Sequence, residues 1–222
     1  MCTLFSFKKS VEEAQSLFEF LQIPLFAPRD YVTPGGPIAV VRNGATGQRE
    51  FAVLRWGFVP SWTKEMQPGR PLLNARSETV YEKPTFRNAI RRRRCLIPAD
   101  GFYEWQGDVP GKKQAWYVHK PDHGAFTFGG VWEHWMHANG SELESVALLT
   151  CAPNLPLSDI HDRSPVVIGP KDYDRWLSTD EEKVQDLLHA PHDDFWVMEK
   201  TTIARKSPPP KPRPVTPQLD LF

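Results

Sequence analysis

The second residue of the chain is a cysteine, and its position allows a chemistry that an internal cysteine cannot perform. Cytosolic aminopeptidases remove an initiator Met when the next residue is small, so loss of Met1 leaves Cys2 with a free α-amine beside its thiol. An α-amine has a pKa of about 7.7–8.0, so a useful fraction is neutral at pH 7. A neutral amine attacks an aldehyde to give a Schiff base. The adjacent thiol then closes a thiazolidine ring, because a neighbouring group reacts at high effective molarity. From position alone, the sequence favours the alternative that Cys2 is an incidental second residue without a chemical role.

Three internal segments contain polar residues suited to proton transfer and phosphate binding. These segments are Leu72–Thr79, Pro98–Trp105 and Asp159–Val166. Glu104 lies among aromatic residues, where a carboxylate with a raised pKa can shuttle a proton. His161 offers an imidazole whose ordinary pKa is near neutral. Taken singly, each residue has an alternative interpretation, such as a solvated strand face, a structural histidine or an amide at a strand end.

Together with the Met-Cys start and the stretch Arg55–Trp62, these segments resemble the SRAP family, the SOS response-associated peptidases or abasic-site processing proteins. The resemblance runs from Cys2 to about Phe195 and includes several motifs in the same order. It implies a covalent nucleophile, an orienting amide, a catalytic carboxylate and a catalytic histidine at Cys2, Asn74, Glu104 and His161. It implies contacts to DNA at Arg76, Trp62 and Arg163.

The sequence also departs from the family at two places. The family usually begins Met-Cys-Gly-Arg, whereas Thr3 and Leu4 follow Cys2 here. Tyr31 stands where the family usually has Asn. We therefore expect a divergent branch that keeps the aldehyde chemistry.

The resemblance implies an abasic-site sensor that binds single-stranded DNA and forms a covalent thiazolidine cross-link through Cys2. Two other hypotheses stay open at this point. Cys2, His161 and Glu104 are also the residue types of a cysteine-dependent peptidase or hydrolase. The remaining hypothesis is that the chain is a non-catalytic DNA-binding adaptor. None of the three needs a cofactor, and we predict neither a cofactor nor a metal site.

The composition changes after about Arg205. The proline-rich stretch 206–217 cannot bury a core and predicts a disordered, extended linker. The residues that follow, Gln218-Leu219-Asp220-Leu221-Phe222, resemble the peptide by which bacterial polymerases and repair proteins bind the DNA sliding clamp. An extended peptide of this kind places Leu219, Leu221 and Phe222 in apolar pockets, while Gln218 makes polar contacts. We therefore divide the chain into a catalytic domain (2–205), a linker (206–217) and a clamp-binding peptide (218–222).

The bulk composition describes an ordinary globular protein. The chain has 222 residues with 40% hydrophobic residues, and 27 Lys and Arg balance 27 Asp and Glu. Contacts to DNA must therefore come from a local basic patch. Three unpaired cysteines argue against a disulfide framework and fit a reducing compartment. Without an apolar run of 18 residues, we expect no membrane association, and we expect a monomer in the cytoplasm, associated with the nucleoid.

The predicted elements describe an α+β domain that is rich in β-strands and has flanking helices. A capping box, Ser10 with Glu13, begins a helix whose apolar positions reach Leu21 and which ends near Pro24. Three more helices are predicted at Thr85–Arg94, Pro170–Leu177 and Thr179–Leu188. The four arginines 91–94 at the end of the first of these predict a mostly solvated basic face. Strands are predicted at Ile38–Val41, Glu50–Trp56, Cys95–Ile97, Phe102–Trp105, Ala115–His119, Phe126–Trp132 and Val146–Thr150.

Overall fold

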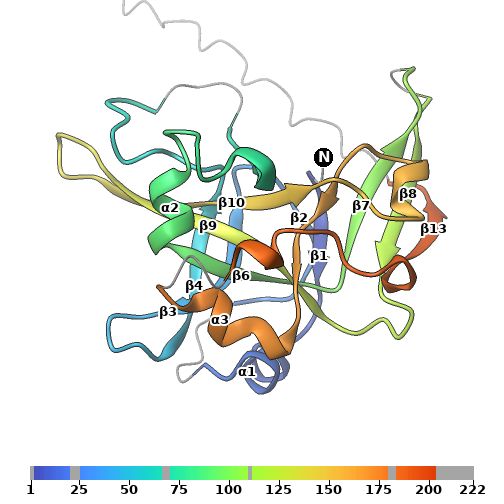
Figure 1. Cartoon of the computed structure of the whole chain (residues 1–222), viewed down its shortest axis with the longest axis horizontal. Coiled ribbons are helices and arrows are strands. Elements are labelled where there is room, and N and C mark those ends of the chain that lie inside the picture. The colour runs from blue at the N-terminus through green and yellow to red at the C-terminus, as the bar shows by residue number, and fades with distance from the viewer. Residues whose placement is uncertain (1–2, 21–25, 67–70, 110–111, 180–183, 204–222) are drawn as a thin grey trace, which may run out of the picture.

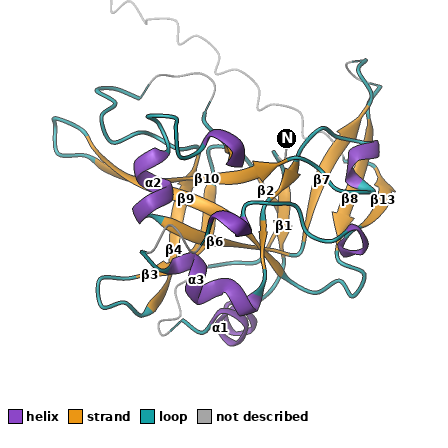
Figure 2. Cartoon of the chain, viewed as in Figure 1, coloured by secondary structure: helices purple, strands orange, loops and turns teal. Residues whose placement is uncertain are grey.

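A computed structural model of the chain describes residues 3–20, 26–66, 71–109, 112–179 and 184–203. Strands dominate the molecule and the helices are short (Figures 1 and 2). Cys2, the linker 206–217 and the predicted clamp-binding peptide 218–222 lie outside the described residues. Within the described residues, no helix is long and apolar enough to cross a membrane.

The larger of two sheets closes into a five-stranded barrel. Each barrel strand pairs with two neighbours, and β10 closes the ring by pairing with both β9 and β4. The barrel strands are β3 (Pro37–Asn43), β4 (Arg49–Trp56), β6 (Arg94–Ala99), β9 (Phe126–Met136) and β10 (Glu142–Cys151). Three short strands extend this sheet: β5 (Asn74–Arg76) and β11 (Ser164–Pro165) pair with β10, and β12 (Val167–Ile168) pairs with β9.

The second sheet is antiparallel and lies beside the barrel (Figure 1). Its strand order is β13-β8-β7-β1-β2. Their bounds are Val197–Thr201, Gln114–His119, Gly101–Gln106, Phe5–Phe7 and Arg29–Val32. Strand β7 follows barrel strand β6 after a single residue, so the chain passes directly from the barrel into this sheet.

Side chains from both sheets fill the barrel interior. Successive strand residues alternate between the two faces of a sheet. Inside the barrel the packing is tight, since a Cβ atom at Gly130 would lie only 2.6 Å from Ile97 Cδ1. At one end, the ring of Phe5 from the second sheet packs against Trp56 and Phe128, with centroid distances of 5.3 and 5.6 Å. The two sheets therefore share one apolar core.

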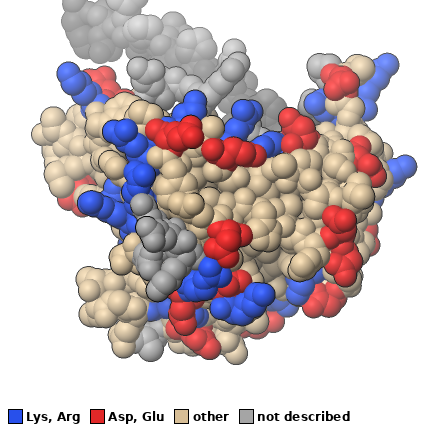
Figure 3. Space-filling view, in the orientation of Figure 1, with Lys and Arg blue, Asp and Glu red and all other residues tan. Residues whose placement is uncertain are grey.

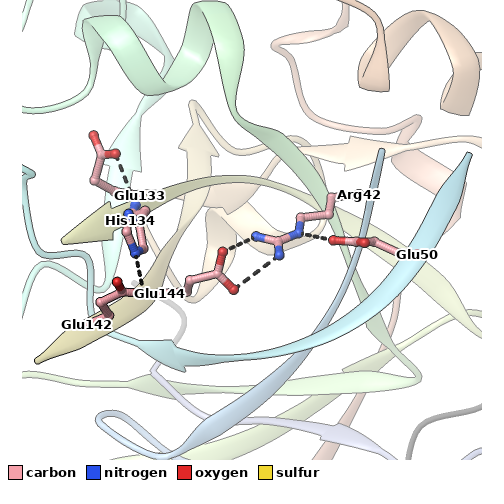
Figure 4. A network of polar contacts seen from close by, with 6 residues as sticks. All are labelled: Arg42, Glu50, Glu133, His134, Glu142 and Glu144. Carbon is pink, nitrogen blue, oxygen red and sulfur yellow. Dashed lines mark hydrogen bonds and ion pairs between the residues drawn. The ribbon is translucent and has the colours of Figure 1, made fainter. Parts of the chain in front are cut away.

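An arginine occupies the inward-facing position at the other end of the barrel. Arg42 lies between Glu50 and Glu144, and donates to both carboxylates at 2.7 Å (Figure 4). Its guanidinium also lies 4.0 Å from the ring centroid of Trp132. Because these four residues come from β3, β4, β10 and β9, the cluster ties four barrel strands together.

The helices cover the outer wall of the barrel. The α-helices are α1 (Val11–Phe18), α2 (Arg87–Arg92) and α3 (Tyr173–Leu177). The 3-10 turns are η1 (Ser77–Thr79), η2 (Leu157–Asp159), η3 (Pro170–Asp172), η4 (Gln185–Leu187) and η5 (Asp193–Phe195). Ala14, Ile90 and Trp176 from the three α-helices belong to one buried cluster on this outer surface.

All seven predicted strands and the capping box are confirmed. Ser10 Oγ accepts from the Glu13 backbone N–H at 3.2 Å, and Glu13 Oε2 accepts from the Ser10 N–H at 2.9 Å. Helix α1 ends at Phe18, earlier than predicted, because Glu19 takes a left-handed conformation with φ of 56°. The predicted helix Thr179–Leu188 is wrong over residues 184–188, because this described part contains only the 3-10 turn η4.

The predicted helix Thr85–Arg94 is also too long, because Arg94 begins strand β6. Arg94 is only 4% exposed, so the prediction of a solvated face is wrong for this arginine. Its guanidinium donates to Ile90 O at 2.7 Å and to Trp176 O at 2.6 Å, and also to Ser178 O. Carbonyls at the ends of α2 and α3 have no partner within their own helices. Arg94 supplies that partner for both helices at once.

Candidate active site

Glu104 is a buried carboxylate at the junction of the two sheets. It lies on β7 two residues after Phe102, so it faces the same side as that core residue. Its cross-strand partner on β8 is Trp116. The residue is only 3% exposed. Burial penalises the charged carboxylate and raises the pKa of Glu104 to about 7.

His161 is brought to Glu104 by a tight turn. The His161 N–H donates to Leu157 O at 3.0 Å, and the side chains of Leu157 and Ile160 are buried in the core. Gln106, which lies two residues after Glu104 on β7, donates from Nε2 to Asp159 O at 3.0 Å and ties this turn to the strand. His161 Nε2 consequently lies 3.7 Å from Glu104 Oε2.

The other ring nitrogen of His161 contacts neighbouring residues, and burial affects the protonation of the ring. His161 Nδ1 accepts the backbone N–H of Arg163 at 2.9 Å. Burial lowers the pKa of His161 and outweighs the nearby Asp162 carboxylate, which acts in the opposite direction. The ring is therefore neutral at pH 7. Nδ1 also lies 3.0 Å from Asp162 Oδ1, so this nitrogen has both a hydrogen-bond donor and an acceptor beside it, while Nε2 faces Glu104.

Asn74 and Arg76 lie on the short strand β5. This strand runs parallel to β10, with Asn74 opposite Leu148 and Arg76 opposite Thr150. Ala75 between them is buried, so alternation places Asn74 and Arg76 together on the other side of the strand. Asn74 is half-buried and Arg76 is exposed. The exposed guanidinium is therefore accessible to a phosphate.

Arg163 is held by a carboxylate next to the same strand. It donates to both oxygens of Glu78 at 2.7 and 2.8 Å, and to Thr150 O at 2.7 Å. The hydrogen bonds from Arg163 lower the pKa of Glu78, and the charge of Arg76 adds to this effect. Arg76 and Arg163 thus both lie next to Thr150, and Glu78 interacts with the charges of both arginines.

The described structure places Trp62 on an exposed loop. Its side chain is 66% exposed. Trp135 anchors the loop by donating from Nε1 to Thr63 O at 2.6 Å, and Val59 N donates to Ser145 Oγ at 2.9 Å. A large aromatic ring on a tethered loop is available for stacking.

Of the residues predicted for the site, the structure brings Glu104 and His161 together and places Asn74, Arg76 and Arg163 on adjoining segments. Cys2 and the clamp-binding residues lie outside the described residues. The sequence analysis missed Gln106 and Glu78. For Gln106, the signal in the sequence was its position two residues after Glu104 on one strand, which places both side chains on the same face. No comparable signal identified Glu78 as the partner of an arginine 85 positions away.

The described residues contain no group of three or more His, Cys, Asp and Glu side chains with the geometry of a metal site. His119 and His123 have the i, i+4 spacing of some metal ligands, but their rings stack on each other with centroids 4.3 Å apart. Charges of both signs are interspersed on the face shown in Figure 3, and Lys and Arg side chains gather where α2 lies. Such a local basic patch is what a protein with no net charge needs for DNA binding.

Comparison with known proteins places these features in a family. A family model described as SOS response associated peptidase (SRAP) matches residues 1–204. The chain is 36% identical over 194 residues to a Bacillus subtilis protein named abasic site processing protein YoqW, covering 86% of each chain. It is 30% identical over 174 residues to abasic site processing protein HMCES of Xenopus tropicalis, covering 68% of this chain and 52% of that relative.

Solved structures show the same fold. A protein from Bordetella bronchiseptica superimposes with a TM-score of 0.79 at 27% identity, covering 91% of this chain and all of the other. A protein from Bacteroides thetaiotaomicron gives a TM-score of 0.79 at 20% identity, covering 90% of this chain and 92% of the other.

Proposed function

This chain belongs to the SRAP family of SOS response associated peptidases, and from that membership we propose that it senses abasic sites in single-stranded DNA and captures them covalently through Cys2. The observation that supports this function best is the pairing of the buried Glu104 with the half-buried His161, 3.7 Å apart. Relatives that match most of the chain are named abasic site processing proteins.

Glu104 opens the sugar. An abasic deoxyribose is mostly a closed hemiacetal, in which the aldehyde is masked. Opening requires a proton to leave the anomeric hydroxyl and a proton to reach the ring oxygen. A carboxyl group with a pKa of about 7 performs both transfers at neutral pH, because its protonated and ionised forms are similarly populated.

The α-amine of Cys2 then attacks the aldehyde carbon. The carbinolamine that forms loses one water to give a Schiff base, and the leaving hydroxyl takes a proton from the acid form of Glu104 or from the imidazolium form of His161. The Cys2 sulfur adds to the same carbon, and its proton moves to the imine nitrogen. The net result is a thiazolidine and one released water.

The register of β1 supports this assignment. Phe5 pairs with Phe102, and the Tyr103 N–H donates to Leu4 O at 2.9 Å. Continuing the same antiparallel register aligns Thr3 with Glu104. Cys2 is joined to Thr3 by one peptide bond, and neighbouring Cα atoms are about 3.8 Å apart. Thr3, the described residue next to Cys2 in the chain, is therefore aligned with the carboxylate, which supports Cys2 as the residue that works with Glu104.

Single-stranded DNA is bound through phosphate and base contacts. Arg76 and Arg163 provide guanidinium groups for adjacent phosphates. Trp62 stacks on a base that has no partner strand. Asn74, on the same side of β5 as Arg76, orients the sugar or the N-terminus.

The C-terminal segment recruits the domain to replicating DNA. Gln218, Leu219, Leu221 and Phe222 bind the bacterial sliding clamp, and the stretch 206–217 is the linker. The protein acts as a monomer in the cytoplasm, at the nucleoid.

The experiment that tests this function is covalent capture on a denaturing gel. The purified protein, with Met1 removal verified by intact mass, is incubated with single-stranded DNA that contains one abasic site. We expect a heat-stable shifted band, which Cys2→Ala or an uncleaved N-terminal tag abolishes. Equal cross-linking by the tagged protein would contradict the α-amine mechanism. Steady turnover of peptides without any DNA adduct would favour the peptidase alternative.

A further inference from the structure

Strand β1, which leads to Cys2, is short and makes few ladder pairs. It has three residues and pairs with β7 at two positions, Phe5 with Phe102 and Ser6 with Gly101. Its pairing with β2 shifts between Phe5 and Phe7, where a bulge interrupts the ladder. The buried side chains of Phe5 and Phe7 fix which face of β1 meets the core, but so short and irregular a ladder adds few contacts of its own. Contacts outside the ladder therefore matter for the position of β1.

Asp100 makes such contacts. Its Oδ1 accepts from Ser6 Oγ at 2.5 Å and its Oδ2 accepts from the Lys8 backbone N–H at 2.5 Å. The Asp100 backbone N–H also donates to Ser6 O at 3.0 Å. One residue thus makes three hydrogen bonds to β1 and to the residue that follows it.

The surroundings of Asp100 make it a rigid reference point. It is the single residue between β6 and β7, and it is only 6% exposed. Tyr117 donates from its hydroxyl to Asp100 O at 3.4 Å. The ring of Tyr117 lies so close to Gly101 that a Cβ there would be 2.2 Å from it, which keeps both residues in one arrangement. Glu104 follows four residues later, on β7.

We propose that Asp100 is a positioning residue that fixes the register of β1 and thereby places the N-terminal nucleophile beside Glu104. The proposal rests on the proposed function of Cys2. Asp100 does not touch the reacting atoms. It acts by joining the strand that leads to Cys2 to the strand that contains Glu104.

The geometry explains why this contact affects the rate. A slip of one residue along a strand moves the chain by about 3.4 Å and turns every side chain to the opposite face. A misplacement of about 1 Å at a reacting centre can cost about 100-fold in rate. Loss of the anchor therefore lowers the fraction of molecules in which Cys2 faces the opened sugar.

The first measurement compares single-turnover rates of cross-linking to abasic DNA. We expect Asp100→Ala to slow adduct formation by about 10–100-fold. Asp100→Asn is the conservative variant, because its amide oxygen can accept from Lys8 N–H while its NH₂ donates to Ser6 Oγ. We expect that variant to stay within about 3-fold of wild type. Thr127→Val is the matched control, since it removes a different buried hydrogen bond, to Ile168 O at 2.8 Å, and leaves β1 intact.

A double-mutant cycle separates positioning from general stability. Insertion of one Gly between Cys2 and Thr3 displaces the nucleophile by about one residue, and we expect it to cost about 100-fold in wild type. In the Asp100→Ala background the N-terminal end of β1 is already displaced, so the same insertion should cost less than about 10-fold. Costs that simply multiply would overturn the proposal.

Amide hydrogen exchange gives a readout that does not depend on activity. The Tyr103 N–H, which donates to Leu4 O across the β1–β7 ladder, should exchange faster in Asp100→Ala and at the wild-type rate in Thr127→Val. If wild type forms no adduct, the proposed function fails. If wild type cross-links and Asp100→Ala matches it in both rate and exchange, the positioning role fails alone. Should Asp100→Ala not fold, Ser6→Ala removes one of the bonds and should slow capture by about 2–10-fold.

Discussion

His161 Nε2 and Glu104 Oε2 lie 3.7 Å apart in a site where burial favours the neutral form of both groups. The pair comes from segments that are 57 positions apart in the sequence, and the turn at Leu157–Asp159 brings them together. A carboxyl group with a pKa of about 7 can both take up and release a proton near neutral pH, and the imidazole beside it is a second group for proton transfer. This property suits a reaction that opens a sugar and then expels water.

Glu104→Gln should slow adduct formation by about 10²–10⁴-fold, because a neutral amide cannot transfer the proton in ring opening. The rate is measured by quenched time points on a denaturing gel, with DNA affinity measured separately by fluorescence anisotropy. We expect affinity to change little, since Glu104 is buried and contacts no phosphate. A near-wild-type rate would make this carboxylate structural.

The same substitution should change how stability depends on pH. The pKa of Glu104 rises from an ordinary 4.5 to about 7 on folding, so its stabilising contribution is complete below pH 4.5 and is lost as pH rises to about 7. Gln does not ionise. At 1.36 kcal/mol per pKa unit, Glu104→Gln should be more stable than wild type by up to about 3 kcal/mol above pH 7, relative to their difference at pH 4.

Urea denaturation at several pH values measures this difference. Glu82→Gln is the control, because Glu82 is exposed, and its stability should stay within about 0.5 kcal/mol of wild type. A pH-independent difference between wild type and Glu104→Gln would show that Glu104 ionises in the folded state as it does in the unfolded chain.

The sequence predicted the barrel strands because their apolar residues come in runs with clear turns between them. The short strands β1, β5 and β13 escaped prediction, since three to five residues hold too little periodicity. Motif resemblance identified Glu104 and His161, but neither burial nor distance can be read from a motif. Gln106 and Asp100 act through contacts to distant segments, and only the folded chain reveals such contacts.

Glu78→Gln should strengthen binding to single-stranded DNA by a few-fold at low salt. Glu78 pairs with Arg163 and lies near Arg76, so it neutralises charge that phosphates would otherwise meet. Arg76→Ala should act in the opposite direction and reduce the slope of log affinity against log salt by about one. Anisotropy titrations at four salt concentrations measure both. An unchanged slope in Arg76→Ala would remove that residue from the phosphate contacts.

Arg94→Met should destabilise the fold by about 3–5 kcal/mol, because it leaves several buried helix-end carbonyls without a donor. Arg92→Met is a matched control two positions away. Arg92 is exposed, and we expect its replacement to change stability by no more than about 0.5 kcal/mol. Urea denaturation compares the two. Equal effects would contradict the structural role that separates Arg94 from the rest of the arginine run.

The sequence predicted a mostly solvated face for the arginine run 91–94. Four consecutive residues spread around a helix, and the helix ends before the run does. The last arginine therefore enters a strand and points into the protein. Helix ends are set by tertiary contacts of this kind, which composition does not reveal.

The last prediction concerns the C-terminal segment. Deleting Gln218–Phe222, or changing Leu221 and Phe222 to Ala, should abolish binding to a bacterial sliding clamp, because the apolar anchors are lost. A short peptide loses ordering entropy on binding, so we expect micromolar affinity, measured by calorimetry with purified clamp. In polyproline form, at about 3.1 Å per residue, the 13 residues from Arg205 to Pro217 would span roughly 40 Å. On this hypothesis the domain would sample nearby DNA while the peptide stays bound, at a raised local concentration. The same deletion should leave cross-linking to free abasic DNA unchanged, since no residue of the active site is removed. Absence of heat, together with no competition against a known clamp-binding peptide at high micromolar concentration, would exclude the clamp as a partner.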